Sequence, residues 1–140
     1  MLDDVYNNKI IELAANISHV GRLEKPNKSA TKVSRLCGSK VTVDIVMSGN
    51  VVIDFAHEVK ACALGQATSS IMAANIIGST IEELLTVSEQ MSKMLKENGP
   101  TPAGKWADLS YLQPVKDYKS RHSSTMLTFE AVNEAIQSIE

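Results

Sequence analysis

Two cysteines are the residues of this 140-residue chain that most readily support chemistry. Cys37 comes just before an alternating run, KVTVDIVM at 40–47, and Cys62 comes just after a second one, VVIDFAHEV at 51–59. The residues SGN between the two runs indicate a β-hairpin. The outer ends of a hairpin lie close together because antiparallel strands are about 5 Å apart. The pattern therefore predicts that two thiols distant in sequence are neighbours in space.

Cys62 also stands at the start of a predicted helix over 63–77. The positive end of the helix dipole favours the thiolate form of a thiol, and thiolate is both a metal ligand and a nucleophile. Cys62 is thus a candidate for a metal or sulfur site shared with Cys37, or for the nucleophile of a small thiol enzyme with a histidine base. The alternative is that both cysteines are ordinary core thiols, because free cysteine is among the most buried residue types.

The chain has three histidines, and the surroundings of two of them suggest where they lie. His57 continues an inward-facing series through Val51, Ile53 and Phe55, which predicts a half-buried strand histidine. His122 lies in the polar run KSRHSS and is predicted to be exposed. The sequence contains no phosphate-binding glycine motif, no HExxH pair and no GxSxG elbow, so no motif nominates a nucleotide or hydrolase site.

The elements that must position these residues follow from hydrophobic periodicity and from turn chemistry. In Thr80-Ile81-Glu82-Glu83, Thr80 is the predicted helix N-cap and Glu83 is predicted to reach back to it, as in a capping box. The predicted elements are a helix over 5–17, a loop over 18–36 with a possible short edge strand at 20–23, the hairpin, a helix over 63–77 stopped by Gly78, a helix from 81 to about 97, a short helical piece at 106–112 and a helix over 123–139. This order predicts one α+β domain over 1–140, with several helices packed against a small antiparallel sheet.

The amino-acid composition argues against several classes of protein. The chain is 44% hydrophobic and 21% charged, which is typical of a globular domain rather than a disordered one. Fourteen basic and sixteen acidic residues give a net charge of −2, and aromatic residues make up 4%, so nucleic-acid binding is not expected. The sequence contains no apolar stretch that could cross a membrane and no secretory signal at its start, which predicts a cytoplasmic protein with reduced cysteines.

Several segments in order resemble one known family. Cys37-Gly38 precedes an alternating strand, Cys62 opens a helix of small residues (ATSSIMAA), and IIGSTIEEL and DLSYLQPVKDYKSRHSSTMLTFEAV follow. From Cys37 to the C-terminus this order resembles the iron–sulfur cluster assembly scaffolds of the IscU, SufU and NifU N-terminal type, and the SufU branch most. The resemblance covers about the last hundred residues.

The resemblance implies a ligand set of three cysteines plus an aspartate or a histidine. Carried over position by position, Cys37 and Cys62 retain thiols, the family's aspartate falls on Ser39, and its third cysteine falls on Ser124. Serine is a poorer ligand than thiolate for zinc or iron. His122, two positions before Ser124, could supply an imidazole, which would give a set of two cysteines and one histidine with one open position.

The resemblance also implies a function that is not enzymatic. A cysteine desulfurase would pass persulfide sulfur to Cys62 or Cys37, and a transient [2Fe-2S] cluster or zinc would sit between them before transfer to iron–sulfur acceptor proteins. The serines at 39 and 124 leave a second function open. In that alternative, the scaffold fold has lost cluster binding, holds neither cluster nor zinc, and serves as an interaction or regulatory module.

Overall fold

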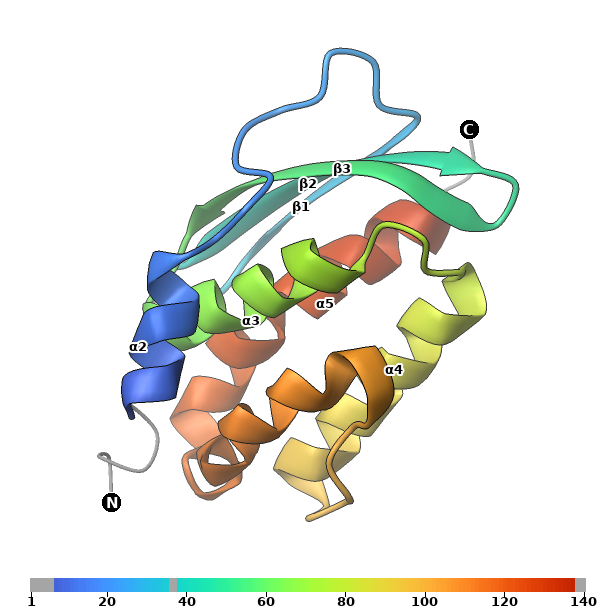
Figure 1. Ribbon diagram of the computed structural model, residues 1–140. Coiled ribbons are helices and arrows are strands. Elements are labelled where there is room, and N and C mark those ends of the chain that lie inside the picture. Colours follow the sequence, from blue (N-terminus) through green and yellow to red (C-terminus); the bar gives the residue numbers. More distant parts are fainter. Residues whose placement is uncertain (1–6, 36–37, 138–140) are drawn as a thin grey trace.

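The computed structural model describes residues 7–35 and 38–137 and confirms the predicted α+β class (Figure 1). Helices pack on one face of a three-stranded antiparallel sheet, and the segment that follows the first described helix crosses the other face. The elements are α2 (Asn8–Ala15), β1 (Lys28–Val33), β2 (Lys40–Ser48), β3 (Val51–Lys60), α3 (Ala63–Asn75), α4 (Ile81–Lys96), the 3₁₀ helices η1 (Gly104–Asp117) and η2 (Lys119–Arg121), and α5 (His122–Gln137). None of the described helices is both long and apolar enough to cross a membrane.

The predicted hairpin is confirmed as β2 and β3. The two strands pair antiparallel, with Ser48 opposite Val51 at the turn and Lys40 opposite Lys60 at the open end. Val41, Val43 and Ile45 on β2 are fully buried in the hydrophobic core, and α3 and α5 lie under the sheet (Figure 1). The strand pairing therefore brings the residues just before β2 beside those just after β3, which is the arrangement the candidate site requires.

The possible third strand exists, but at a different place from the one predicted. Residues 28–33 form β1, an edge strand paired antiparallel with β2. Its sequence KSATKV contains few large apolar residues, so the two-residue period that marks a half-buried strand is weak. Near the expected position at 20–23 there is only a single parallel bridge, between Val20 and His57.

The expectation that Ile53 faces inward is wrong, because the pairing of β2 with β3 contains an irregularity. Val46 lies opposite Asp54 while Met47 lies opposite Val52, so Ile53 is the extra residue of a bulge. Ile53 is 53% exposed, whereas Val52 is fully buried. An inserted residue shifts the two-residue period by one, and the apolar series read from the sequence loses its phase there.

His57 is fully buried rather than half-buried, and it holds the segment that follows α2. Its ring packs against Phe55 with centroids 4.9 Å apart, and Nε2 lies 2.9 Å from the carbonyl oxygen of Ser18, to which it donates. The backbone N–H of His57 donates to the His19 carbonyl, and the N–H of Gly21 donates to the His57 carbonyl. Burial lowers the pKa of His57, so the ring is neutral at pH 7 and acts as a structural anchor.

The helix starting at Thr80 is confirmed, with one difference in how it is capped. The Thr80 hydroxyl oxygen accepts from the backbone N–H of Glu83 at 3.1 Å, as an N-cap does. The Glu83 carboxylate does not close the predicted capping box. It accepts instead from Trp106 Nε1 at 2.8 Å and pairs with Lys105 Nζ at 3.0 Å. The local sequence pattern therefore predicted the start of the helix correctly, but the Glu83 carboxylate binds Trp106 and Lys105, which are distant in sequence.

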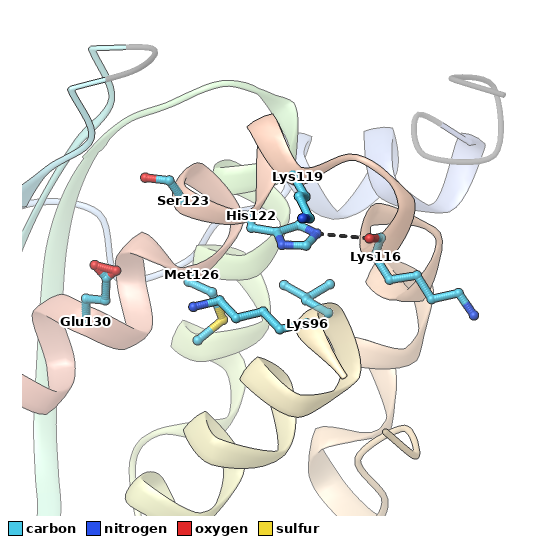
Figure 2. Close-up of a pocket in the computed structure, with 8 residues that line it drawn as sticks. Lys96, Lys116, Lys119, His122, Ser123, Met126 and Glu130 are labelled. Atoms are coloured by element: carbon cyan, nitrogen blue, oxygen red, sulfur yellow. Dashed lines mark hydrogen bonds between the residues drawn. The ribbon is translucent and has the colours of Figure 1, made fainter. Parts of the chain in front are cut away.

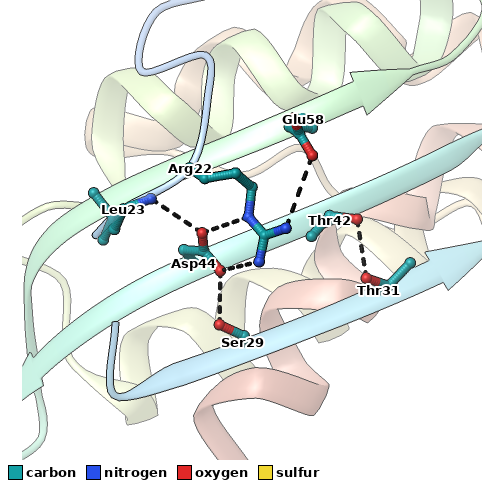
Figure 3. A network of polar contacts seen from close by, with 7 residues as sticks. All are labelled: Arg22, Leu23, Ser29, Thr31, Thr42, Asp44 and Glu58. Carbon is teal, nitrogen blue, oxygen red and sulfur yellow. Dashed lines mark hydrogen bonds and ion pairs between the residues drawn. The ribbon is translucent and has the colours of Figure 1, made fainter. Parts of the chain in front are cut away.

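The outer face of the sheet carries a buried carboxylate, Asp44, shown in Figure 3. Arg22 donates to it twice, from Nε at 2.6 Å and from Nη2 at 3.0 Å. The Leu23 backbone N–H donates at 3.1 Å and the Ser29 hydroxyl at 2.6 Å. Burial by itself would raise the pKa of Asp44, but the hydrogen bonds from Arg22, Ser29 and Leu23 outweigh it and hold the pKa below its ordinary value. Asp44 thereby ties the crossing segment to β2.

Candidate functional site

Cys62 lies where β3 ends and α3 begins. It is the N-cap residue of α3, with an extended backbone, and its side chain is half-buried. An open pocket of about 500 Å³ surrounds it, and the residues that line the pocket are Gly38, Ser39, Val59, Lys60, Ala61, Cys62 and Gln66. Apart from Gln66 on α3, these residues lie at the open end of the hairpin, just before β2 and at or just after the end of β3, which the strand pairing brings together. Cys37 itself lies outside the described residues, and Gly38, which follows it, lines the Cys62 pocket.

Ser124, on the first turn of α5, lies next to Cys62. The Cys62 Sγ atom is 3.6 Å from the Ser124 Oγ atom, and the Ser124 hydroxyl also donates to the Arg121 carbonyl at 3.2 Å. Ser39 is almost fully buried and lines the same pocket as Cys62. The structure thus brings Cys62, Ser39 and Ser124 to one place, although they are far apart in the sequence.

His122 is not part of this group, and the prediction that it is exposed is wrong. Its side chain is nearly buried, and Nε2 donates to the carbonyl oxygens of Val115 at 3.0 Å and Lys116 at 3.2 Å. His122 lines a second pocket, beside Lys96 and Lys119, and not the Cys62 pocket. The physical reason is helical geometry: two residues on, at about 100° each, Ser124 points to nearly the opposite side of α5.

The described residues thus supply only part of a metal-binding set. Within residues 7–35 and 38–137, no three His, Cys, Asp or Glu side chains gather closely enough to hold a metal ion. The lining of the Cys62 pocket, as far as the structure describes it, contains no histidine, so a thiol enzyme with a histidine base finds no support there. What the arrangement offers is one accessible thiol, two hydroxyl groups and the position that follows Cys37.

Two lysines face each other at the open end of the hairpin. Lys40 opens β2 and Lys60 closes β3, and they are directly opposite in register, so their side chains share one face. Like charges in that position repel each other, while Lys60 also lines the Cys62 pocket. In the sequence the only sign of this is the position of Lys60, two residues before Cys62.

Gly65, in the first turn of α3, lies close to Ala61 and to the backbone of α5. A Cβ atom on Gly65 would lie 2.8 Å from the Ala61 Cβ and 3.1 Å from the Ser124 backbone oxygen. We expect Gly65→Ala to lower the free energy of unfolding by about 1–3 kcal/mol, because overpacking outweighs the better helix propensity of alanine. Urea denaturation measures this change. Gln66→Ala, one residue further on, is the control, and a Gly65→Ala protein as stable as the parent would contradict the close contact.

A family model described as the NifU-like N-terminal domain matches residues 5–137, which is nearly the whole chain. The chain belongs to this family. The match includes the N-terminal helix and the segment that crosses the sheet, in addition to the region from Cys37 onward. It confirms the resemblance on which the candidate ligand positions Ser39 and Ser124 rest.

Relatives of this NifU-like chain are named as scaffold proteins. It is 25% identical over 135 residues to the iron–sulfur cluster assembly scaffold protein IscU of Thermotoga maritima, a match that covers 96% of this chain and 94% of that one. It is 30% identical over 84 residues to IscU 1 of Archaeoglobus fulgidus, covering 60% of this chain and 55% of that one.

Solved structures agree with the NifU-like fold. The crystal structure of a NifU-like protein (N-terminal) from Brucella abortus superposes with a TM-score of 0.95 at 56% identity, covering 97% of this chain and 94% of that one. A putative SUF-system scaffold protein from Fervidobacterium islandicum gives a TM-score of 0.88 at 22% identity, covering 96% of this chain and 98% of that one, and supports the fold alone.

Proposed function

We propose that this protein is a scaffold or sulfur acceptor of iron–sulfur cluster assembly that holds a transient [2Fe-2S] cluster or zinc between Cys37 and Cys62. The observation that carries the proposal is the 3.6 Å approach of the Cys62 Sγ atom to the Ser124 Oγ atom, at the edge of an open pocket that Ser39 also lines. Three positions that the family uses for ligands therefore meet, and the fourth, Cys37, directly precedes a residue that lines the same pocket.

The chemistry requires the chain to accept sulfur without any net oxidation. The Cys62 thiolate attacks the terminal sulfur of a persulfide on a cysteine desulfurase, and a new sulfur–sulfur bond forms. The sulfur–sulfur bond on the desulfurase breaks and leaves its cysteine as a thiolate. Lys60, which lines the pocket, favours the negative charge that the acquired persulfide carries. In this role the protein is a carrier for the desulfurase and for acceptor proteins rather than an enzyme, and it works in the reducing cytoplasm, where thiols stay free.

Two thiolates with two serines suit a cargo that must leave again. Thiolate is a soft ligand that zinc and iron–sulfur clusters prefer, whereas a neutral hydroxyl group binds both weakly. A metal or cluster held by Cys37 and Cys62 alone would have open coordination positions, which the ligands of an acceptor protein could fill during transfer. The substitutions at Ser39 and Ser124 thus weaken retention without removing the thiols.

The proposal is tested by the metal and acid-labile sulfide content of protein purified without oxygen. We expect zinc or iron near one equivalent in the parent protein, and a loss of nearly all of it in Cys37→Ser and in Cys62→Ser. Ser123→Ala is the matched control, because the Ser123 hydroxyl bonds Ser34 at 2.9 Å and not Cys62. Equal metal content in the parent and both cysteine variants would refute a site at these thiols.

A second function is favoured by one observation at the same site. The Ser124 hydroxyl already donates to the Arg121 carbonyl, so it fills a structural role where the family has a cysteine ligand. In this alternative the protein is a scaffold-fold interaction module without cargo. A partner captured equally well by the parent and by a metal-free protein lacking both cysteines would support the module. A partner lost with the cysteines would support the scaffold.

A further inference from the structure

A second pocket, of about 600 Å³, lies on the other side of α5 from Cys62. It is formed by the last turn of α4, the junction of η1 and η2, and the first turns of α5 (Figure 2). The residues that line it are Leu95, Lys96, Lys116, Lys119, His122, Ser123, Met126 and Glu130. None of these residues takes part in the Cys62 pocket. The proposed scaffold function therefore leaves the second pocket unexplained.

The charges around this pocket are predominantly positive, in a chain whose net charge is −2. Lys96 and Lys119 form no ion pair with any carboxylate in the part of the chain that the structure describes, whereas Lys93 and Lys105 do. Figure 2 shows Lys119 beside the His122 ring and Lys96 beside Met126, while Lys116 carries its ammonium group away from that ring. Unpaired ammonium groups at one pocket repel each other, and an anion between them relieves that repulsion.

The ammonium group of Lys116 already has a hydrogen-bond partner within the protein. Its Nζ atom donates to the side-chain oxygen of Asn98 at 2.9 Å, and Figure 2 shows this ammonium group directed away from the His122 ring. Glu130 places a single carboxylate on the wall formed by α5. The charges free to meet a ligand are therefore those of Lys96 and Lys119, and together they exceed the charge of Glu130.

Leu95, Met126 and the His122 ring also line the pocket, beside the polar Ser123 and Glu130. Leu95 and Met126 are buried and form its apolar part. The nearly buried His122 ring contributes the small part of its surface that is exposed, and the hydrogen bonds of its Nε2 atom to two backbone carbonyls hold its orientation. Small-molecule sites in proteins combine such apolar walls with a few fixed polar groups.

We propose that this pocket binds a small organic anion in which a phosphate or carboxylate group is attached to a flat apolar group. The anionic group lies between Lys96 and Lys119, and the apolar group packs on Leu95, Met126 and the His122 ring. The inference is independent of the Cys62 site, since it needs neither a metal nor a thiol.

Phenyl phosphate is the probe that tests this proposal, by calorimetric titration of the full chain at about 0.15 M salt, where long-range attraction is screened beyond about 8 Å. We expect saturable binding at one site. Inorganic phosphate and phenol, which carry only one of the two features each, should bind at least about tenfold more weakly. Lys96→Gln and Lys119→Gln should each raise the dissociation constant about fivefold, and the double variant about twentyfold.

Lys116→Gln is the matched control, because it removes the same charge from the lining of the same pocket. We expect it to change the dissociation constant less than about twofold, since its ammonium group is held by Asn98. Amide chemical shifts should change at Leu95, His122 and Ser123 when phenyl phosphate is added. No saturable binding, equal binding of inorganic phosphate, an equal effect of Lys116→Gln, or shifts confined to other residues would each overturn the proposal.

Discussion

Replacing Ser124 with cysteine is expected to raise the affinity of this protein for zinc about 100-fold. Structural zinc sites with four ligands have binding free energies of about 10–16 kcal/mol, or about 3 kcal/mol for each ligand. A third thiolate next to Cys62 should therefore strengthen binding by about two orders of magnitude. Competition with a chromophoric zinc chelator at pH 7, with reductant present, measures the dissociation constants of the parent and the variant.

The side chain at position 124 is already close enough to Cys62 for this gain in zinc affinity. Two sulfur ligands of a tetrahedral zinc ion with bonds of about 2.3 Å lie about 3.8 Å apart. The Cys62 Sγ and Ser124 Oγ atoms are 3.6 Å apart, so a sulfur at position 124 needs little movement to share a metal with Cys62. In the proposed site, serine at this position would weaken retention, because its side chain lies next to Cys62 but its neutral hydroxyl is a poor ligand.

Ser123→Cys is the control for this prediction. It adds the same thiol one residue earlier on the same turn, where the parent side chain bonds Ser34 rather than Cys62. We expect its zinc affinity to remain within about threefold of the parent, because successive helix positions point about 100° apart. If both variants gain equally, the added thiol acts without the Cys62 site, and the proposed ligand position at 124 is wrong.

Asp44→Ala is expected to lower the free energy of unfolding by about 3 kcal/mol at pH 7. The carboxylate is fully buried, and its removal leaves the Leu23 N–H, the Ser29 hydroxyl and the Arg22 guanidinium without their acceptor. Breaking one partner of a buried ion pair costs about 3–5 kcal/mol, and we take the lower end because Arg22 reaches solvent. Urea denaturation followed by circular dichroism measures the change.

Glu58→Ala is the matched control, since Glu58 also pairs with Arg22. That pair is 3.9 Å apart between two exposed side chains, with exposed fractions of 52% and 60%. Exposed ion pairs contribute about 0–1 kcal/mol, so Glu58→Ala should cost less than about 1 kcal/mol. Equal costs for the two variants would show that Arg22 stabilises the sheet through solvent-exposed charge rather than through the buried carboxylate.

The same network has a pH dependence whose sign follows from the lowered pKa of Asp44. A carboxylate with a depressed pKa binds fewer protons in the folded state than in the unfolded state. Its contribution is fully present above the ordinary value of 3.8 and is lost as the pH falls below it, through the pKa of the folded state. The difference in stability between the parent and Asp44→Ala should therefore shrink between pH 5 and pH 2. A difference that stays constant over this range would contradict the role given to the ionised carboxylate.

Much of the fold could be predicted because its signals are local. The β2–β3 hairpin follows from alternating residues around SGN, and the start of α4 follows from Thr80, whose hydroxyl accepts from a backbone N–H three residues on. Strand β1 escaped prediction because KSATKV is an edge strand with little apolar surface. Ile53 was assigned to the wrong face, since a bulge depends on the partner strand and leaves no mark in a single run of sequence.

The candidate site could likewise be predicted only in part from the sequence. Cys62 at the start of a helix could be identified from the residues, and the hairpin placed it beside the segment that contains Ser39. The partnership of Cys62 with Ser124 came from family resemblance and is a contact between α3 and α5 that no local pattern encodes. His122 was predicted to be exposed and was only a candidate third ligand, and the helical phase of α5 turns it to the other pocket.

By itself, then, the sequence determined the class of fold, the hairpin, the helix at Cys62 and the family to which the chain belongs. These features rest on period, turn chemistry and the order of motifs along the chain. Only the tertiary structure decided that Asp44 and His57 are buried, that Ser124 meets Cys62, and that His122 lies with Lys96 and Lys119. The direction and burial of a side chain depend on which distant segments pack against it, and that packing is a property of the whole chain rather than of any short stretch.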